Sequence, residues 1–332
     1  MEDSFHMSIR RLITLSIIFT AIVSTWCRGG IPCGKDNNSI DTVQHSIIFI
    51  SDTQAPMRFE KIIMRTHRNE EATKILLNTI LSDSTVSSVF LFGDITAMGS
   101  IEYNWTSIDS FLTHLKIRRI PAYVAAGNHD YLLSPSAGEG NLKKRFPDFK
   151  RTGYSIRNGP LALVLLNSNF GELNQSEEIQ QQEWYLKELH ALEQDSTIKM
   201  VAVGCHHPPF SNSTIVGHDQ QVRDKFVPPF MKSSKCRLFL SGHTHTFQHF
   251  RDTVANKHFL VIGGGGGLLH TLKAGEPDEL QDQVQWNTEY RMFHFVRGVI
   301  STDGLSLNVM MLTEDLAGPQ SVYNVFIPFS HQ

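Results

Sequence analysis

The sequence predicts an α/β fold with mixed sheets, and two features of its apolar pattern support this class. From residue 45 onward, short apolar runs alternate with segments of helical periodicity, which is typical of βαβ units packed around a largely buried sheet. Near the end of the chain, three strand-like runs instead follow one another with turns between them. The 332 residues are also enough to bury a sizeable core.

Seven apolar runs are expected to form the strands of the alternating part, at residues 46–50, 88–92, 122–126, 162–166, 198–203, 237–240 and 259–262. Helices are predicted between them, because residues 101–115 place apolar side chains at steps of 4, 3, 4 and 3, the spacing of one helix face. Residues 75–80 and 179–192 repeat this pattern. The final strands are expected at residues 292–300, 305–312 and 322–329, with turns at 302–304 and 318–319.

The first 27 residues indicate a signal peptide or membrane anchor. Arg10 and Arg11 precede an uncharged apolar stretch at residues 12–26, the arrangement of a cleaved secretory signal. This stretch of 15 residues is shorter than the about 18 expected of a spanning helix; an uncleaved anchor and a buried core helix remain as alternatives. We therefore expect a secreted or periplasmic protein, with a linker at residues 28–44 and a single catalytic domain at residues 45–332.

Charge and cysteine content exclude several classes of protein. The 30 Lys and Arg against 33 Asp and Glu leave a net charge of −3, which disfavours binding to nucleic acid by bulk positive charge. Four cysteines are too few for a disulfide scaffold of this length. Cys205 is predicted at the end of one parallel strand and Cys236 at the start of another, so they should not be bridged.

Five predicted strands are each followed by polar side chains that bind metals in other proteins. These are Asp52 and Gln54, then Asp94, then Asn128 with His129 and Asp130, then His206 with His207, and finally His243 with His245. The loops that leave parallel strands meet at one edge of a sheet, so these side chains should lie together. Each motif alone has a structural explanation, such as a turn or a helix cap, but turns do not require two carboxylates, an amide and three imidazoles at one edge.

This set of ligands suits two divalent metal ions, with Mn, Fe, Zn and Mg as the alternatives. Two ions about 3.5 to 4 Å apart can share a bridging carboxylate, whereas one ion would leave ligands unused. Two ions, two carboxylates and a bridging hydroxide sum to about +1, a charge that attracts phosphate. The expected chemistry is hydrolysis of a phosphate ester by that hydroxide.

The five motifs resemble those of the calcineurin-like metallophosphoesterases, in the same order and over about residues 46–250. Residues 206–245 are most similar to the purple acid phosphatase branch. The resemblance implies a four-layer αββα sandwich with two sheets flanked by helices. It also implies Asp52, Asp94 and His245 around one ion, with Asp94 bridging to a second ion held by Asn128, His206 and His243.

The same resemblance assigns the catalytic residues. His129 would lie beside the scissile phosphate and stabilise the transition state or protonate the leaving oxygen, work that suits a histidine near neutral pH. Asp130 is expected to orient its neighbours rather than bind metal. His206, not His207, is taken as the ligand because the family's His-x-Pro motif aligns Pro208 two positions later.

Two positions depart from the family pattern. Gln54 stands where the family usually has histidine, so it is expected to be a weaker ligand of the first ion. Ala97 stands where the purple enzymes have the tyrosine of their coloured ferric site, so we predict an all-divalent, colourless pair of ions.

Three further features lie outside the five motifs. His218 and Arg223 lie in the long segment between two metal motifs and are predicted to contact substrate. The glycines at residues 263–267 are expected to allow a close backbone passage beside the site or a positive φ, with a phosphate-contacting loop as the alternative.

The function expected from the sequence is that of an exported dinuclear phosphohydrolase acting on a small phosphorylated substrate, preferably a phosphomonoester. A phosphodiesterase or nucleotide pyrophosphatase is the first alternative, favoured by Gln54 and the sequence from His206 to Pro209. A non-catalytic module that binds phosphorylated ligands through a weakened metal site is the second. Membrane contact is expected only through an uncleaved N-terminal segment.

Overall fold

The computed structural model describes residues 45–329 except 58, 64, 274–280 and 287. The predicted signal or anchor at residues 1–27, the linker at 28–44 and Cys33 lie outside this part of the chain. No helix in the described ranges combines the length and apolar character needed to cross a membrane.

The first of two six-stranded sheets has the order β12-β11-β10-β1-β2-β3. Its parallel part contains β1 (Ser46–Ile50), β2 (Val86–Leu91) and β3 (Ala122–Val124). β10 (His294–Ile300), β11 (Gly304–Leu312) and β12 (Pro319–Pro328) extend it with antiparallel pairing. These last strands are the sequential, turn-connected strands predicted near the end of the chain.

The second sheet has the order β4-β5-β6-β7-β9-β8. Its parallel strands are β5 (Leu161–Leu165), β6 (Met200–Gly204), β7 (Cys236–Ser241) and β9 (Lys257–Ile262). The two edge strands, β4 (Tyr154–Asn158) and β8 (Phe247–Asp252), pair antiparallel with their neighbours.

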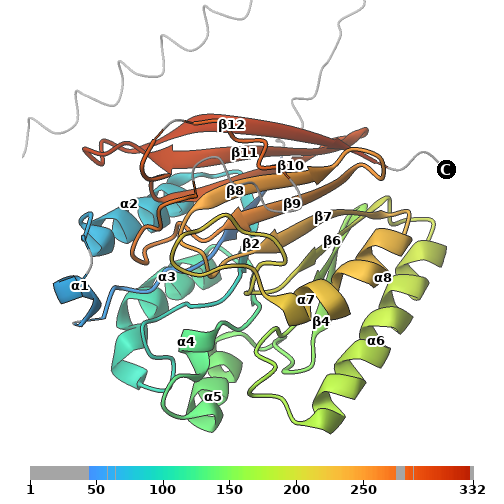
Figure 1. The fold of residues 1–332 in the computed structure, drawn as a ribbon, viewed down its shortest axis with the longest axis horizontal. Helices are drawn as coiled ribbons and strands as arrows, with labels where there is room; N and C mark the ends of the chain where they lie inside the picture. Colours follow the sequence, from blue (N-terminus) through green and yellow to red (C-terminus); the bar gives the residue numbers. More distant parts are fainter. Residues whose placement is uncertain (1–44, 58, 64, 274–280, 287, 330–332) are drawn as a thin grey trace, which may run out of the picture. The chain divides into compact units, whose positions relative to one another are not determined.

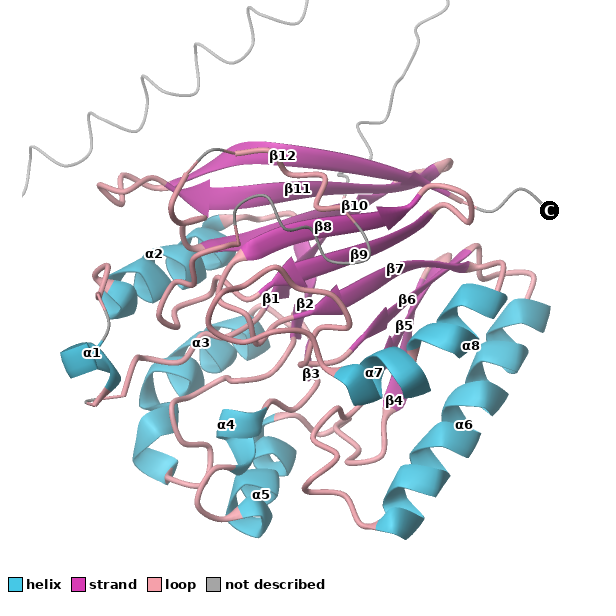
Figure 2. Cartoon of the chain, in the orientation of Figure 1, coloured by secondary structure: helices cyan, strands magenta, loops and turns pink. Residues whose placement is uncertain are grey.

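The helices lie outside the two sheets, in the four-layer arrangement that the family resemblance implies (Figures 1 and 2). One group contains α1 (Glu60–Ile63), α2 (Asn69–Ser82), the 3₁₀ turn η1 (Glu102–Trp105), α3 (Thr106–Ile117), α4 (Asn128–Tyr131) and α5 (Pro135–Arg145). The other contains α6 (Gln175–Gln194), α7 (Gln220–Lys225) and α8 (Val227–Lys232).

Alternation along β5 shows how the layers are separated. Leu161, Leu163 and Leu165 belong to the large core cluster shared with the first sheet, whereas Ala162 and Val164 belong to a second cluster with helix residues such as Tyr185. Successive side chains of a strand point to opposite faces, so this strand packs against a sheet on one face and helices on the other. A strand buried on both faces has the continuous apolar run from which it was predicted.

The structure corrects the expectation of one common sheet edge. The metal motifs follow β1, β2 and β3 of one sheet and β6 and β7 of the other. The strands β4 and β8 were not predicted, because their sequences YSIRN and FQHFRD lack an apolar run. Phe247 and Phe250 are buried and lie on β8. Cys205 and Cys236 are buried and unbridged, as predicted.

Candidate metal centre

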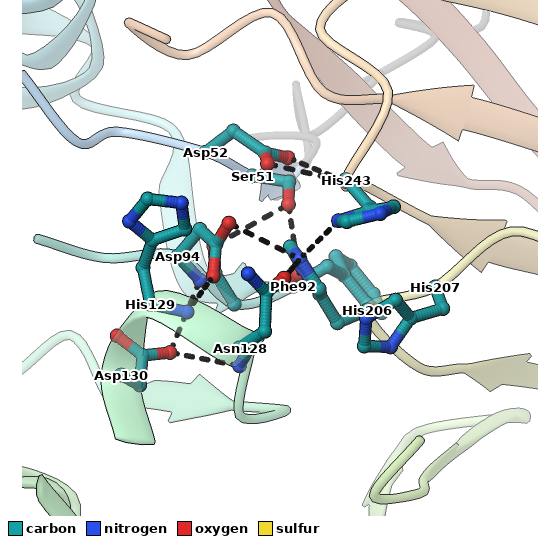
Figure 3. A network of polar contacts seen from close by, with 12 residues as sticks. Ser51, Asp52, Phe92, Asp94, Asn128, His129, Asp130, His206, His207 and His243 are labelled. Atoms are coloured by element: carbon teal, nitrogen blue, oxygen red, sulfur yellow. Dashed lines mark hydrogen bonds and ion pairs between the residues drawn. The ribbon is translucent and has the colours of Figure 1, made fainter. Parts of the chain in front are cut away.

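The strand-end side chains from the two sheets meet in one buried cluster (Figure 3). Asp52, Asp94 and His206 each offer a ligand atom within 4.8 Å of the others, and His206, His207 and His243 form a second such group. His206 belongs to both groups. The loops after β1, β2, β6 and β7 therefore converge although they leave different sheets.

His206 occupies the middle of the cluster. Its Nε2 lies 3.2 Å from Asp94 Oδ2, 3.1 Å from Asn128 Oδ1 and 3.2 Å from His243 Nδ1. Its Nδ1 lies 2.8 Å from the Phe92 carbonyl, an acceptor that requires the proton to be on Nδ1. Nε2 of the neutral ring is then available as a metal ligand.

Asp52 and His245 form the other half of the cluster. Their Oδ1 and Nε2 atoms lie 3.3 Å apart, and His245 Nδ1 contacts the Leu268 carbonyl at 2.7 Å. This contact fixes the His245 ring in the same way as Phe92 fixes that of His206. Asp52 also accepts the backbone N–H of His243 at 3.0 and 3.1 Å, which ties the loop after β7 to the loop after β1.

Three of these residues have an unusual backbone conformation. Asp52, Asp94 and His243 have φ values of 57°, 51° and 65°, a region that few residues other than glycine adopt. Gly93 has φ of 87°, and a Cβ there would meet His206 Nδ1 at 2.7 Å. Backbone strain of this kind clusters at functional sites because the surrounding structure must maintain it.

His129 and Asp130 are placed differently, although both belong to α4. His129 donates its backbone N–H to Asp94 Oδ1 at 2.8 Å, and its Nδ1 lies 2.9 Å from the Ala97 carbonyl. Asp130 is fully buried and accepts the backbone N–H groups of Asp94, Ile95 and Gly127 at 2.8 to 3.0 Å. These contacts agree with the interpretation of Asp130 as an orienting residue.

The two carboxylates are almost fully removed from solvent, at 0% exposure for Asp52 and 1% for Asp94, and histidines form ion pairs with both. Burial alone would raise the pKa of Asp94, but the neighbouring His206, His129 and His243 outweigh it and hold the pKa below its usual range. Burial opposes protonation of His206, yet Asp94 raises its pKa to about 9. A buried anionic pair among ring nitrogens and an amide oxygen fits divalent cations.

Gln54 is buried at 3% exposure beside Asp94. With its amide nitrogen turned toward Asp94, it donates to Oδ2 at 3.2 Å and to the backbone carbonyl at 3.1 Å. The structure thus places Gln54 in the cluster, in contact with the carboxylate expected to bridge the two ions.

The glycine run at residues 263–267 is the close backbone passage that was expected. Gly265 N–H donates to the Ser51 carbonyl at 2.9 Å and Gly267 N–H to the Asp52 carbonyl at 3.1 Å. A Cβ on Gly267 would meet the His245 ring at 2.3 Å. None of the five glycines has a positive φ, so close approach, rather than conformational freedom, explains them.

The structure does not bring the two predicted substrate residues into the cluster. His218 is exposed in the loop before α7. Arg223 donates from Nε to the Pro209 carbonyl at 3.1 Å, and its guanidinium lies 4.6 Å from the centre of the Phe210 ring. Their assignment as substrate contacts stays a prediction.

Sequence reasoning missed the polar residues that follow β5. Ser168 bonds to His207, and Asn169 donates to the Ala126 carbonyl at 2.8 Å. The run at residues 162–166 was recognised as a strand, and the sequence Asn-Ser-Asn directly after it was the available signal. Serine and asparagine after a strand usually form turns, so this signal alone does not indicate a site.

The two packed sheets, with metal-binding residue types at their strand ends, have the fold of the metallophosphoesterases. The family model of the calcineurin-like phosphoesterases matches residues 45–247, most of the described chain, and this protein belongs to that family. Comparison with curated proteins found no match.

Solved structures with the same fold are distant in sequence. GAP50, the anchor in the inner membrane complex of Plasmodium, has 12% identity and a TM-score of 0.66, with 87% of this chain and 90% of that chain covered. A dimetal phosphatase from Danio rerio has 15% identity and a TM-score of 0.54, with coverages of 86% and 99%. PhoD has 13% identity and a TM-score of 0.50, with coverages of 86% and 72%.

Proposed function

We propose that this protein is an exported phosphohydrolase that binds two divalent metal ions and hydrolyses phosphate esters, with phosphomonoesters preferred. The observation that carries the proposal is the convergence of Asp52, Asp94 and His206 within 4.8 Å of one another. The proposal of export rests on Arg10, Arg11 and the apolar stretch that follows them.

The ligand assignment follows the geometry of the cluster. Asp52 and His245 would hold one ion, with Gln54 as a weaker ligand. Asn128, His206 and His243 would hold the other, and Asp94 would bridge the two. When bound, the ions supply positive charge for the phosphoryl oxygens and lower the pKa of water.

The residues of the chain itself orient the substrate and move a proton. Hydrolysis forms a bond from the water oxygen to phosphorus, breaks the bond to the leaving oxygen and transfers a proton to that oxygen. The Ala97 carbonyl holds one nitrogen of the His129 ring at 2.9 Å, which leaves Nε2 to donate this proton when the ring is doubly protonated.

Metal analysis combined with hydrolysis of nitrophenyl phosphate and its bis-ester tests the proposal. We expect two ions per chain after incubation with Mn, faster hydrolysis of the monoester, and loss of both activity and at least one ion in Asp94→Asn. The exposed Asp148→Asn variant is the matched control and should behave as the wild type. Less than one ion per chain with no hydrolysis would favour the non-catalytic module instead.

Gln54 favours a diesterase or pyrophosphatase as the second candidate function. It is a neutral amide buried against Asp94 where the family pattern usually has histidine. A clear preference for the bis-ester in the same assay would replace the monoesterase with this candidate. Export is tested separately, by fractionation of cells that express the full chain.

A further inference from the structure

A cavity of about 260 Å³ opens beside the candidate metal centre. We propose that this cavity receives the leaving group of the substrate and selects esters of uncharged or cationic alcohols over substrates whose leaving group carries a phosphate. The inference rests on the proposed function and adds a substrate class to it. Its lining includes Asn128, Ser168, Phe170, Glu172, His207 and Asp219.

The cavity adjoins the reacting centre directly. Asn128 lines it, and the Oδ1 of this residue lies 3.1 Å from His206 Nε2. His207 lines it too, with its ring centre 4.4 Å from that of His243 and 4.9 Å from that of His206. Figure 3 shows these three histidines side by side. If the ions hold the phosphoryl group of a substrate, the cavity is therefore close enough to receive the group attached to its ester oxygen.

One wall of the cavity is held rigidly by buried amides. Gln181, at 1% exposure, accepts the backbone N–H of Asn167 at 2.8 Å and donates to its carbonyl at 2.9 Å. Two residues later, Asn169 donates to the Ala126 carbonyl at 2.8 Å. The segment that supplies Ser168, Phe170 and Glu172 is thus fixed before substrate binds, which a selective subsite requires.

Ser168 contacts His207 at two points. The Ser168 oxygen accepts the backbone N–H of His207 at 3.0 Å and lies 2.8 Å from His207 Nδ1. When the Ser168 O–H donates to Nδ1, the neutral ring carries its proton on Nε2, and His207 offers a hydrogen-bond donor to the cavity. An alcohol oxygen of the leaving group is the acceptor it suits.

The charged side chains that line the cavity oppose an anionic leaving group. Glu172 and Asp219 are its ionisable acids, and no Lys or Arg is among the described residues that line it. Asp219 Oδ1 accepts the backbone N–H of Val222 at 2.9 Å at the start of α7, so Glu172 is the carboxylate that can be changed without loss of a helix cap. A second phosphate in this space would face carboxylates and no lining cation.

The test compares phosphoethanolamine, whose leaving group is a cationic alcohol, with ADP, whose leaving group is anionic. On the Mn-loaded full chain, we expect kcat/KM for phosphoethanolamine to exceed that for ADP at least tenfold. Glu172→Lys should shift this ratio at least tenfold toward ADP and leave the metal content unchanged. Glu183→Lys, the same charge change on an exposed part of α6, is the matched control.

The role of His207 is tested by comparing kcat/KM for substrates with different leaving groups. His207→Phe should lower kcat/KM for glycerol phosphate about tenfold more than for nitrophenyl phosphate, because nitrophenolate departs without a hydrogen-bond donor. His207→Gln, which keeps an N–H donor, should recover most of this difference. An equal loss on both substrates in both variants would overturn the role given to His207.

Binding measured by calorimetry separates this inference from the proposed function. Phosphoethanolamine and ADP are titrated into the Mn-loaded wild type and Glu172→Lys. A binding preference that inverts in the variant, without hydrolysis of any substrate, would overturn the proposed function and support the cavity as a selective site. If Glu172→Lys changes the preference for phosphoethanolamine over ADP neither in binding nor in catalysis, the inference itself is wrong.

Discussion

At the scale of single residues, the candidate site depends on a carboxylate that touches no expected ligand side chain. Asp130 accepts N–H groups from the backbones of Asp94, Ile95 and Gly127, and so joins the loop after β2 to the loop after β3. Burial, and next to it the charge of Asp94, raise the pKa of Asp130, while the N–H donors favour the charged form. These contacts predict that Asp130 positions Asp94 and, through Gly127, the neighbouring Asn128.

We predict that Asp130→Asn weakens metal binding and lowers stability. An asparagine presents N–H₂ to at least one of the three backbone donors, which leaves a buried donor unsatisfied at about 1 to 3 kcal/mol. Loss of an orienting partner typically costs 10-fold to 100-fold in metal affinity. Metal titration and thermal unfolding of the metal-free protein check the two effects separately. Unchanged affinity in a folded variant would remove the positioning role.

At the scale of elements, the glycine segment at residues 263–267 connects the two sheets at the candidate site. The chain leaves β9 through residues 263–267 and passes so close to the loop after β1 that Gly265 and Gly267 bond to its carbonyls. Asn69 of α2 donates to the carbonyls of Gly266 and Gly267 at 2.9 and 2.8 Å. The segment thereby links α2, β1 and the His245 loop.

Gly267→Ala is expected to destabilise the protein and weaken metal binding together. The added Cβ would lie 2.3 Å from the His245 ring, and overpacking of this kind costs about 1 to 3 kcal/mol. The ring must move, so its alignment with Asp52 is lost. Gly217→Ala is the matched control because its Cβ would meet no atom within 4 Å. Equal melting temperatures and metal affinities for both variants would refute this account of the glycine run.

At the scale of the whole molecule, three histidines outside the site are buried in neutral form in and between the sheets. His249 bonds to His258 at 2.9 Å and to Tyr323 of β12 at 2.9 Å, which joins the edge strands of the two sheets. His294 on β10 has 0% exposure and contacts the Met292 carbonyl at 2.8 Å. Burial lowers the pKa of His249 to about 3 and those of His258 and His294 to about 4.

These buried histidines predict a loss of stability in acid. The unfolded chain binds protons below about pH 6.5 but the folded chain does not until about pH 4, so stability is present above pH 6.5 and falls as the pH approaches the folded pKa. One such histidine removes about 2 kcal/mol between pH 7 and pH 5. Denaturant unfolding at both values should show a smaller loss in His294→Leu than in the wild type. His190→Leu, at an exposed position of α6, should leave the loss unchanged.

Many strands could be predicted from their local apolar pattern, and the two strands that could not, β4 and β8, share a physical cause. Strands such as β5 and β6 are buried on both faces, so their apolar runs reveal them directly. β4 and β8 are edge strands whose polar side chains are satisfied by partners far away in sequence, as His249 is by Tyr323. No local pattern encodes such a partner, so these strands could not be predicted.

By itself, the sequence predicted which side chains gather at the candidate site, since the order of five motifs singled out Asp52, Asp94, Asn128, His206, His243 and His245. It could not determine that these residues leave two sheets rather than one, nor that Ser168 contacts His207. Each motif consists of residues close together in the sequence, so it can be recognised without a structure. The pairing of sheets, the contact between glycine backbone and ring, and the lining of a cavity are distances between remote segments, and only tertiary packing sets those distances.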